Sequence, residues 1–240
     1  MNAGIVSTGL KVNGQETLFQ FFDNPLSRRI CEEILNGRTY PAVGIPGEVG
    51  TIVDIGANVG AAAIHFAATQ PRARIFCFEP VPDTFRLLEQ NTRWAGGRIQ
   101  CRNVGLSNQN ARLPMFRGAV DSVTNSVHPN AETSRESFEI QVRDAASALA
   151  EAGIKKIDIL KVDTEGCEVV IFESLQSYLP EVMVIYLEYH SEQDRLTLDQ
   201  LLSPTHLLAK GTINGLHRGE LCYVSRKWVE TLPVTGRIGA

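Results

Sequence analysis

Short apolar runs alternate with helix-like segments from residue 51 onwards, and this alternation limits the fold more than any other feature of the chain. The apolar runs lack the period-2 pattern of a strand with one exposed face, so each strand should be buried on both faces. They cover residues 51–56, 73–80, 98–107, 156–166 and 181–190. Buried strands separated by helices predict a doubly wound α/β fold around a mostly parallel sheet.

Helices are expected between these strands, and a hairpin is expected after them. Asn24 and Pro25 mark the start of the first helix, and Gly37 marks its end. The other predicted helices cover residues 59–71, 81–97, 144–153 and 167–180. Two apolar segments, 206–213 and 219–229, predict an antiparallel hairpin at the C-terminal edge of the sheet.

The chain divides into two parts after residue 50. Residues 1–50 contain one predicted helix and a loop rich in proline and glycine, so we expect a helical extension that caps the ligand pocket or forms a homodimer face. Residues 51–240 are expected to form the cofactor-binding domain. Within it, the polar stretch 117–137 is long for a connection and predicts either a cover over the ligand or a mobile surface loop.

Charge and cysteine content argue against several classes of function. The formal net charge is −4 and no block of Lys and Arg occurs, so no nucleic-acid partner is expected. The five cysteines form no CxxC pair, which argues against a disulfide scaffold and a structural zinc site. The N-terminus lacks the pattern of a signal peptide, and no apolar run has the length of a membrane span. We therefore expect a cytoplasmic protein without membrane contact.

The segment TIVDIGANVG, residues 51–60, ends the first buried strand in a glycine turn, the place where an open parallel sheet binds its ligand. A dinucleotide turn counted from Gly56 would need glycine at positions 58 and 61, but Asn58 and Ala61 are found there. The carboxylate of Asp54 would repel a phosphate and suits a cation. S-adenosylmethionine (SAM) carries a sulfonium and an ammonium and no phosphate, so we predict that this turn binds SAM.

The predicted cofactor contacts lie in this turn, at the ends of the next two strands, and at Asp163, which follows the fourth strand. In the turn they are Asp54, Gly56, Asn58, Val59 and Gly60. The two glycines should keep the turn tight and let backbone amides reach the ligand's carboxylate. Glu79, 25 residues after Asp54, closes the second strand, where a carboxylate can accept hydrogen bonds from both ribose hydroxyls. Pro80 follows it, and Ser107 at the end of the third strand should approach the adenine.

The chain resembles the FkbM-type family of SAM-dependent methyltransferases in four strings that occur in this order: VDIGANVG, FEPVP, NVGLS and LKVDTEGCEVVIFES. The resemblance covers residues 51–190, and its most specific part is the pairing of DIGANVG with KVDTEGCE. It implies a Rossmann-like class I methyltransferase fold. It also implies methyl transfer, usually to oxygen, on a small hydroxylated acceptor such as a sugar or a specialised metabolite.

Two further strands end in side chains that suit proton transfer. Asp163 and Glu165 follow one strand, and Glu188 and His190 end the next, so all four should face one cleft. A hydroxyl nucleophile must lose a proton, and the imidazole of His190 is the expected general base. Alternatively, the four side chains could hold a Mg²⁺ ion. Glu165 could instead only stabilise the N-terminus of the following helix.

Two other functions remain open from the sequence. The acid at the end of the second strand serves NAD as well as SAM, so an NAD-linked oxidoreductase or epimerase is one alternative, against which the missing second glycine counts. A protein that binds SAM without turnover is another, because a fold does not fix a function. The acids beyond two further strand ends disfavour it, since cofactor binding alone does not require them.

Overall fold

A computed structural model describes residues 4–45, 47–118 and 133–231. The elements follow one another in this order: β1 (Ile5–Val12), β2 (Gln15–Phe22), α1 (Pro25–Leu35), β3 (Thr51–Ile55), α2 (Ala61–Thr69), β4 (Arg74–Phe78), α3 (Pro82–Thr92), η1 (Arg93–Ala95), β5 (Ile99–Arg102), β6 (Gly105–Ser107), β7 (Ala111–Gly118), β8 (Thr133–Asp144), α4 (Ala145–Glu151), β9 (Ile159–Val162), α5 (Glu168–Ser174), η3 (Leu179–Glu181), β10 (Val184–Tyr189), α6 (Glu192–Leu202), β11 (His206–Gly215), β12 (Arg218–Ser225) and α7 (Arg226–Val229).

Seven strands form the central sheet, in the order β11-β12-β10-β9-β3-β4-β5. The five strands from β10 to β5 run parallel, whereas β12 runs antiparallel to both β10 and β11. The predicted doubly wound, mostly parallel sheet is therefore present, and the predicted C-terminal hairpin forms one edge. Because β3, β4, β9 and β10 are parallel neighbours, their carboxyl ends meet along one rim of the sheet.

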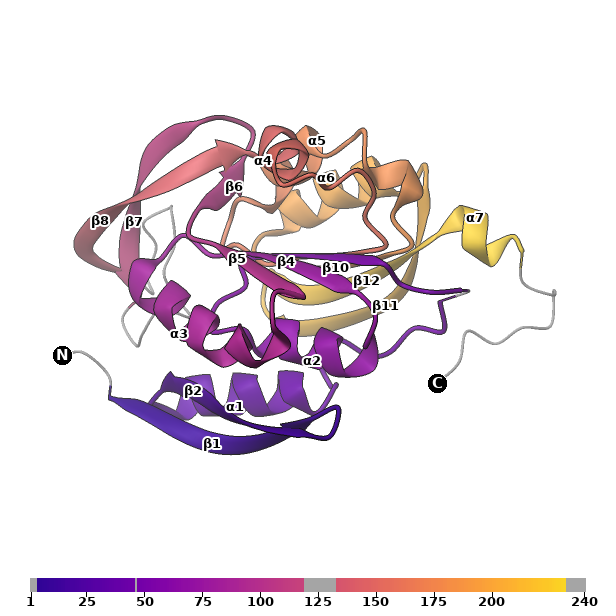
Figure 1. Ribbon diagram of the computed structural model, residues 1–240. Coiled ribbons are helices and arrows are strands. Elements are labelled where there is room, and N and C mark those ends of the chain that lie inside the picture. Colours follow the sequence, from indigo (N-terminus) through magenta and orange to yellow (C-terminus); the bar gives the residue numbers. More distant parts are fainter. Residues whose placement is uncertain (1–3, 46, 119–132, 232–240) are drawn as a thin grey trace.

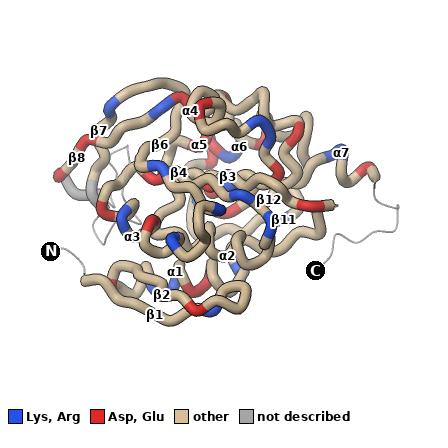
Figure 2. Tube along the Cα trace, in the orientation of Figure 1, with Lys and Arg blue, Asp and Glu red and all other residues tan. Residues whose placement is uncertain are grey.

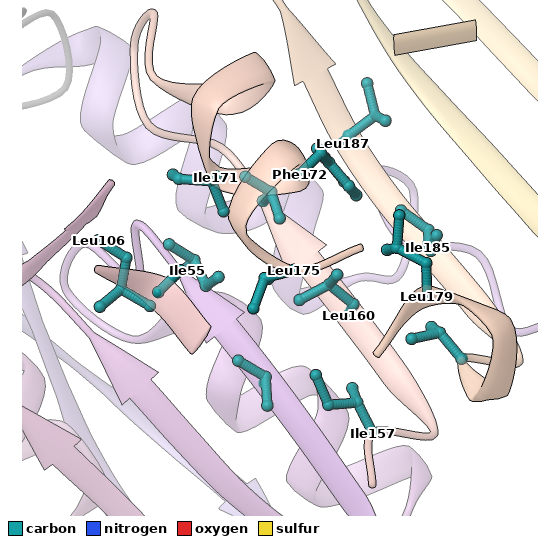
Figure 3. Packing of buried hydrophobic residues seen from close by; sticks show 14 of the residues in the cluster. Ile55, Leu106, Ile157, Leu160, Ile171, Phe172, Leu175, Leu179, Ile185 and Leu187 are labelled. Atoms are coloured by element: carbon teal, nitrogen blue, oxygen red, sulfur yellow. The ribbon is translucent and has the colours of Figure 1, made fainter. Parts of the chain in front are cut away.

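Helices cover the sheet on both faces (Figure 1). On one face lie α2 and α3, with α1 and the β1–β2 hairpin outside them; on the other lie α4, α5 and α6. Acidic and basic residues are interspersed along the described trace (Figure 2). Figure 3 shows how α5 packs on the sheet, with Ile171, Phe172 and Leu175 directed at Leu160 of β9 and Ile185 of β10.

The central parallel strands are mostly apolar because both of their faces are covered. All four residues of β9 are buried, and so are five of the six residues of β10. The inward side chains on one face join the cluster of α5, and those on the other join the cluster around Phe66 of α2. Burial on both faces explains the missing period-2 pattern and confirms the prediction of helices on both sides.

The N-terminal extension differs from the expected helical segment, because two strands precede its helix. Strands β1 and β2 pair in register through a two-residue turn, with Val12 opposite Gln15. Asn13 and Gly14 both have positive φ, 50° and 84°, as a type I′ turn requires. The Asn-Gly pair between two alternating runs is the sequence signal for this hairpin. The predicted helix is confirmed, and the side chain of its N-cap Asn24 accepts a hydrogen bond from the Ser27 amide.

The hairpin packs directly on the domain that follows. Asn91 of α3 binds the Gln20 backbone in both directions, accepting from its amide at 2.7 Å and donating to its carbonyl at 2.8 Å. The Asn91 amide also donates to the carbonyl of Val59 in the glycine turn. Phe19 and Phe21 are buried against Ile64 and its neighbours. A single buried asparagine thus ties the extension to the turn predicted to bind the cofactor.

The predicted third strand, residues 98–107, is two strands in different sheets. Strand β5 ends at Arg102, and β6 then joins β8 and β7 in a separate three-stranded sheet. Asn103 lies at the break, where its side chain donates to the carbonyls of Glu79 and Pro80. Residues 119–132 of the predicted loop 117–137 lie outside the described residues. The ends of that segment are strand, since β7 extends to Gly118 and β8 begins at Thr133.

The turn after β3 needs glycine because β9 ends against it. Gly56 has φ +79°, and a Cβ atom there would lie 1.7 Å from the carbonyl oxygen of Asp163. Gly60 has φ +91°, and its Cβ would lie 2.9 Å from a methyl group of Leu88. Gly56 therefore meets a fixed backbone atom, whereas Gly60 meets the end of a side chain that can move.

We expect Gly56→Ala to lower the free energy of unfolding by more than about 3 kcal/mol, because the cost of the strained backbone and the cost of the collision with a backbone atom add together. Gly153→Ala is the matched control, since Gly153 also has positive φ, +73°, but a Cβ there meets nothing within 4 Å. That variant should lose only about 1 kcal/mol. Urea unfolding of both variants tests this, and equal losses would contradict the collision.

Candidate active site

A cavity of about 630 Å³ opens at the carboxyl ends of β3, β4, β9 and β10. Its outer walls come from α1, the segment that follows α1, and the β11–β12 hairpin. Eight of the predicted site residues line it: Gly56, Asn58, Val59, Glu79, Pro80, Asp163, Glu165 and Glu188. The four remaining predicted residues, Asp54, Gly60, Ser107 and His190, are not among the lining residues.

The amides of the glycine turn all have partners within the protein. Those of Gly56 and Ala57 donate to the carbonyl of Phe78. The Asn58 amide donates to Glu79, that of Val59 to the Asn58 side chain, and that of Gly60 to the Ala57 carbonyl. The structure therefore does not favour the expectation that amides of this turn bind a ligand's carboxylate, because each of the five already has an acceptor. The turn shapes the cavity floor.

Glu79 is buried at the end of β4 with both carboxylate oxygens facing backbone amides. Oε2 accepts from Asn58 at 3.0 Å and Oε1 accepts from Val81 at 2.8 Å. Burial raises the pKa of Glu79 to about 7, although these two amide bonds oppose the rise. Each oxygen keeps a free lone pair beside the cavity, so the predicted contact with two ribose hydroxyls is compatible with this geometry.

Asp54 was expected to contact the ligand, but it does not line the cavity. It is fully buried, and Lys161 of the neighbouring strand approaches it, with Nζ 3.2 Å from Oδ1. Lys161 also donates to the Gly56 carbonyl at 2.6 Å and lies 3.5 Å from Asp163 Oδ2. Burial raises the pKa of Asp54, although the nearby ammonium opposes the rise. Burial alone would lower the pKa of Lys161, but the neighbouring carboxylates raise it well above its usual value. Asp54 therefore holds Lys161 in place, and Lys161 is the residue that lines the cavity.

Ser107 lies away from the cavity because the chain leaves the central sheet after β5. It is buried in β6, where it pairs with Asp144 of β8. The residues of this strand that line the cavity are Gly105 and Leu106. A contact between Ser107 and the adenine is therefore not favoured, and the two preceding residues take that position.

His190 is surrounded by carboxylates. Its Nε2 lies 3.1 Å from Glu165 and 3.9 Å from Glu188, and its Nδ1 lies 3.4 Å from Glu168. Burial by itself lowers the pKa of His190, but the charges of Glu165 and Glu168 outweigh it and raise the pKa to about 11. An imidazolium with that pKa keeps its proton at neutral pH and cannot accept another. The structure therefore speaks against His190 as the general base.

Glu165 and Glu168 act on the loop between β9 and α5. Glu165 has φ +56°, which is rare for a residue with a side chain, and its carboxylate lies between His190 and Arg218 of β12, 3.3 Å from the latter. Glu168 accepts hydrogen bonds from the amides of Thr164 and Gly166. Glu168 thus supports the loop, and Glu165 is held between two cations, although burial raises its pKa.

Glu188 and Asp163 are the two carboxylates that remain for chemistry. Both line the cavity, with side chains 21% and 30% exposed. Burial raises the pKa of Glu188 well above its usual value, and the negative charge of Asp163 adds to the rise. A carboxylate with a raised pKa is a stronger base than an ordinary glutamate, so Glu188 suits proton abstraction.

The cluster does not fit a Mg²⁺ site. Asp163, Glu188 and His190 each offer one atom, and these atoms lie within 4.8 Å of one another. Mg²⁺ prefers oxygen ligands, however, and His190 would first have to lose a proton that two carboxylates stabilise.

Among the lining residues that were not predicted from the sequence, Lys161 and Tyr40 bear most directly on the site. Lys161 lies within an apolar strand, and its register opposite Asp54 is visible only once β3 and β9 are paired. Tyr40 lies in the proline-rich segment expected to be a loop, yet it is 7% exposed and packs against Phe66 and Tyr186. No local pattern in the sequence distinguishes it.

Comparison with known proteins decides the family. The family described as "Methyltransferase FkbM domain" matches residues 54–208. The chain belongs to the FkbM methyltransferase family. The resemblance seen in the sequence is thus confirmed, and methyl transfer is favoured over the NAD-linked alternative.

Several curated methyltransferases resemble this FkbM methyltransferase. A hexuronic acid methyltransferase of Haloferax volcanii is 28% identical over 175 residues, which cover 72% of this chain and 69% of that protein. A 2-O-methyltransferase of Sinorhizobium fredii is 26% identical over 156 residues, covering 59% and 64% of the two chains. "Methyltransferase 1" of Beauveria bassiana is 28% identical over 180 residues, covering 65% and 72%.

A solved structure supports the fold of this FkbM methyltransferase. Fibrillarin of Aeropyrum pernix, in complex with SAM, superposes with a TM-score of 0.50 at 14% identity and covers 91% of this chain and 82% of its own. This similarity shows a Rossmann-like methyltransferase fold.

Among the described residues, none of the helices has both the length and the apolar character needed to cross a membrane.

The raised pKa of Glu79 predicts a pH-dependent affinity for the cofactor product S-adenosylhomocysteine (SAH). Only the ionised carboxylate can accept from both ribose hydroxyls, and with a pKa of about 7 its ionised fraction rises about tenfold between pH 6 and pH 8. The affinity should rise by the same factor. Glu79→Gln should remove this rise. Any pH dependence that comes from ionisation of SAH itself should be the same for the variant and the wild-type protein. Isothermal titration at three pH values tests this, and parallel profiles would contradict it.

Lys161→Met should destabilise the protein by about 3–5 kcal/mol at pH 8, because it leaves Asp54 buried without its partner. Without the ammonium, burial raises the pKa of Asp54 in the folded state above its unfolded value. The folded state then binds the extra proton, so stability returns as the pH falls and is lost as it rises. Urea unfolding at pH 5.5 and pH 8 measures this. The double variant Asp54→Asn/Lys161→Met should recover much of the loss at pH 8, and equal stability of the single variant at both pH values would contradict the pairing.

Proposed function

We propose that this FkbM methyltransferase uses SAM to methylate a hydroxyl group of a small molecule, with a sugar acid as the leading acceptor class. The observation that carries the proposal is the placement of the glycine turn, Glu79 and the carboxylates Asp163 and Glu188 around one cavity. Family membership supports methyl transfer, and the fibrillarin structure with SAM supports a fold that accommodates this cofactor.

The order of the strands orients the cofactor in the cavity. Glu79 at the end of β4 accepts from the ribose hydroxyls, and Gly105 and Leu106 of β6 border the adenine. Asp163 at the end of β9 would then hold the methionine end, on the other side of the turn after β3. Glu188 lies on β10, the next strand of the sheet, and would face the acceptor.

Bound SAM supplies a methyl group on a positively charged sulfur, which leaves as a thioether when the acceptor oxygen forms its bond to that carbon. Glu188 takes the hydroxyl proton during the transfer. Asp163, beside Glu188, raises the affinity of Glu188 for that proton. His190 holds Glu165 and limits the negative charge of the group, so that the carboxylates can lie close together.

The acceptor enters between α1 and the β11–β12 hairpin. Helix α1 contributes Leu26, Arg29 and Ile30 to the wall, and the hairpin contributes Thr212 and Asn214. The expected role of residues 1–50 as a cap is supported by this position. Two relatives are named as hexuronic acid and 2-O-methyltransferases, which supports a hydroxyl on a sugar as the target.

We expect methyl transfer from SAM with a labelled methyl group to glucuronic acid, detected by mass spectrometry as a product that gains one methyl. Neutral glucose, tested alongside, shows whether the acid group matters. Titration with SAM and SAH is the direct test of the cofactor, and absence of binding for both would refute the proposal. Cofactor binding without transfer to any of a panel of hydroxylated acceptors would favour the protein that binds SAM without turnover.

Glu188→Gln should lower kcat by about 10²–10⁴-fold while SAH affinity changes by less than about threefold, because a general base contributes to the transfer step and not to cofactor binding. Once an acceptor is known, the same measurement on Asp163→Asn separates the two carboxylates. Full turnover in Glu188→Gln together with its loss in Asp163→Asn would assign the base to Asp163.

A further inference from the structure

Tyr40 is the one aromatic residue that the N-terminal extension contributes to the cavity wall. Its ring packs between two aromatic side chains, 5.7 Å from Phe66 and 5.5 Å from Tyr186 between ring centroids. The backbone around it is also fixed, because His65 donates to the Tyr40 carbonyl at 3.0 Å if its Nε2 carries the proton, and Tyr186 donates to the Pro41 carbonyl at 2.6 Å. The phenol is therefore held rigidly at the cavity.

The hydroxyl of Tyr40 has no hydrogen-bond partner among the residues that the structure describes, although the residue is only 7% exposed. The hydroxyl is not one of the fully enclosed polar atoms without a partner, so it is open to the cavity, where it can donate to a ligand. Burial raises the pKa of the phenol well above its usual value, although Lys161 opposes the rise, so the group keeps its proton as a donor.

Its charged neighbours locate this hydroxyl along the cofactor. The charges that act on the phenol belong to Lys161, Asp163, Asp54 and Glu188, all from β3, β9 and β10. These strands lie on the opposite side of the glycine turn from β4, where Glu79 accepts from the ribose. Tyr40 therefore borders the end of the cavity that the methionine part of SAM reaches.

A carboxylate at this end has few donors to choose from. The five amides of the turn, from Gly56 to Gly60, all have partners. The ammonium of Lys161 faces the Gly56 carbonyl and two carboxylates. Other donors on the cavity wall include the first amides of α2, which begins at Ala61, and the side chains of Asn58, Thr39 and Arg38. Among the donors on this wall, the hydroxyl of Tyr40 is the one fixed by two aromatic neighbours.

We propose that Tyr40 donates a hydrogen bond to the α-carboxylate of SAM, opposite Asp163, which receives the α-ammonium. Resting on the proposed use of SAM, this inference assigns the amino-acid end of the cofactor to a residue outside the part of the chain that matches the family. The N-terminal segment then belongs to the cofactor site as well as to the acceptor wall.

Titration of SAM and decarboxylated SAM into the wild-type protein, Tyr40→Phe and Tyr186→Phe tests the assignment. Tyr40→Phe should weaken SAM binding about tenfold, the usual effect of a lost hydrogen bond to a charged group, and should leave decarboxylated SAM unchanged. Tyr186→Phe is the matched control, because it removes a hydroxyl that fixes the same segment but does not line the cavity. Any loss in that variant should affect both ligands by the same factor.

Equal losses of both ligands in Tyr40→Phe, or no loss of SAM binding, would overturn the assignment and leave the other donors of the cavity wall as the carboxylate site. Melting temperatures of the two variants show whether each keeps its fold. A wild-type protein that binds neither ligand would refute the proposed function as a whole. Wild-type binding that Tyr40→Phe does not change would refute only this inference.

Discussion

The ammonium of Lys161 joins the two strands on which the site depends. It lies between the buried Asp54 of β3 and Asp163 at the end of β9, and it also holds the carbonyl of Gly56. These contacts bring the glycine turn so close to β9 that no side chain fits at position 56. The floor of the cavity and the position of Asp163 follow from this close approach.

Carboxylates dominate the rim of the sheet, yet few of them are free for chemistry. Glu165 and Glu168 are neutralised by His190, and Asp54 by Lys161. Glu79, Asp163 and Glu188 remain, and burial raises the pKa of Glu79 and of Glu188. Such groups are destabilising as anions in the empty cavity, and a ligand that carries positive charge and hydroxyl donors relieves this. The rim is therefore suited to a sulfonium cofactor before any acceptor is considered.

The central sheet could be predicted from the sequence because strands buried on both faces consist mostly of apolar residues, as β9 and β10 do. The sequence also marked Gly56, Glu79 and Asp163, whose side chains or missing side chains act locally at strand ends. The structure does not favour the roles predicted for Asp54 and His190, because their charged partners come from other parts of the fold and change what each group can do. Lys161 and Tyr40 were missed for the same reason: their importance depends on long-range contacts. The β1–β2 hairpin was also missed, although its Asn-Gly turn is a local signal for it.

The packing of the first fifty residues has a consequence for how this enzyme could diversify. The part that matches the family begins at residue 54, whereas α1 and Tyr40 wall the cavity from outside it. A chain that contained only the matching part would lack this wall of the cavity, and Phe66 and Tyr186 would lose Tyr40 as their aromatic neighbour. Exchange of this short leading segment between relatives could therefore alter the choice of acceptor, but only where the replacement restores a cover for the same aromatic surface.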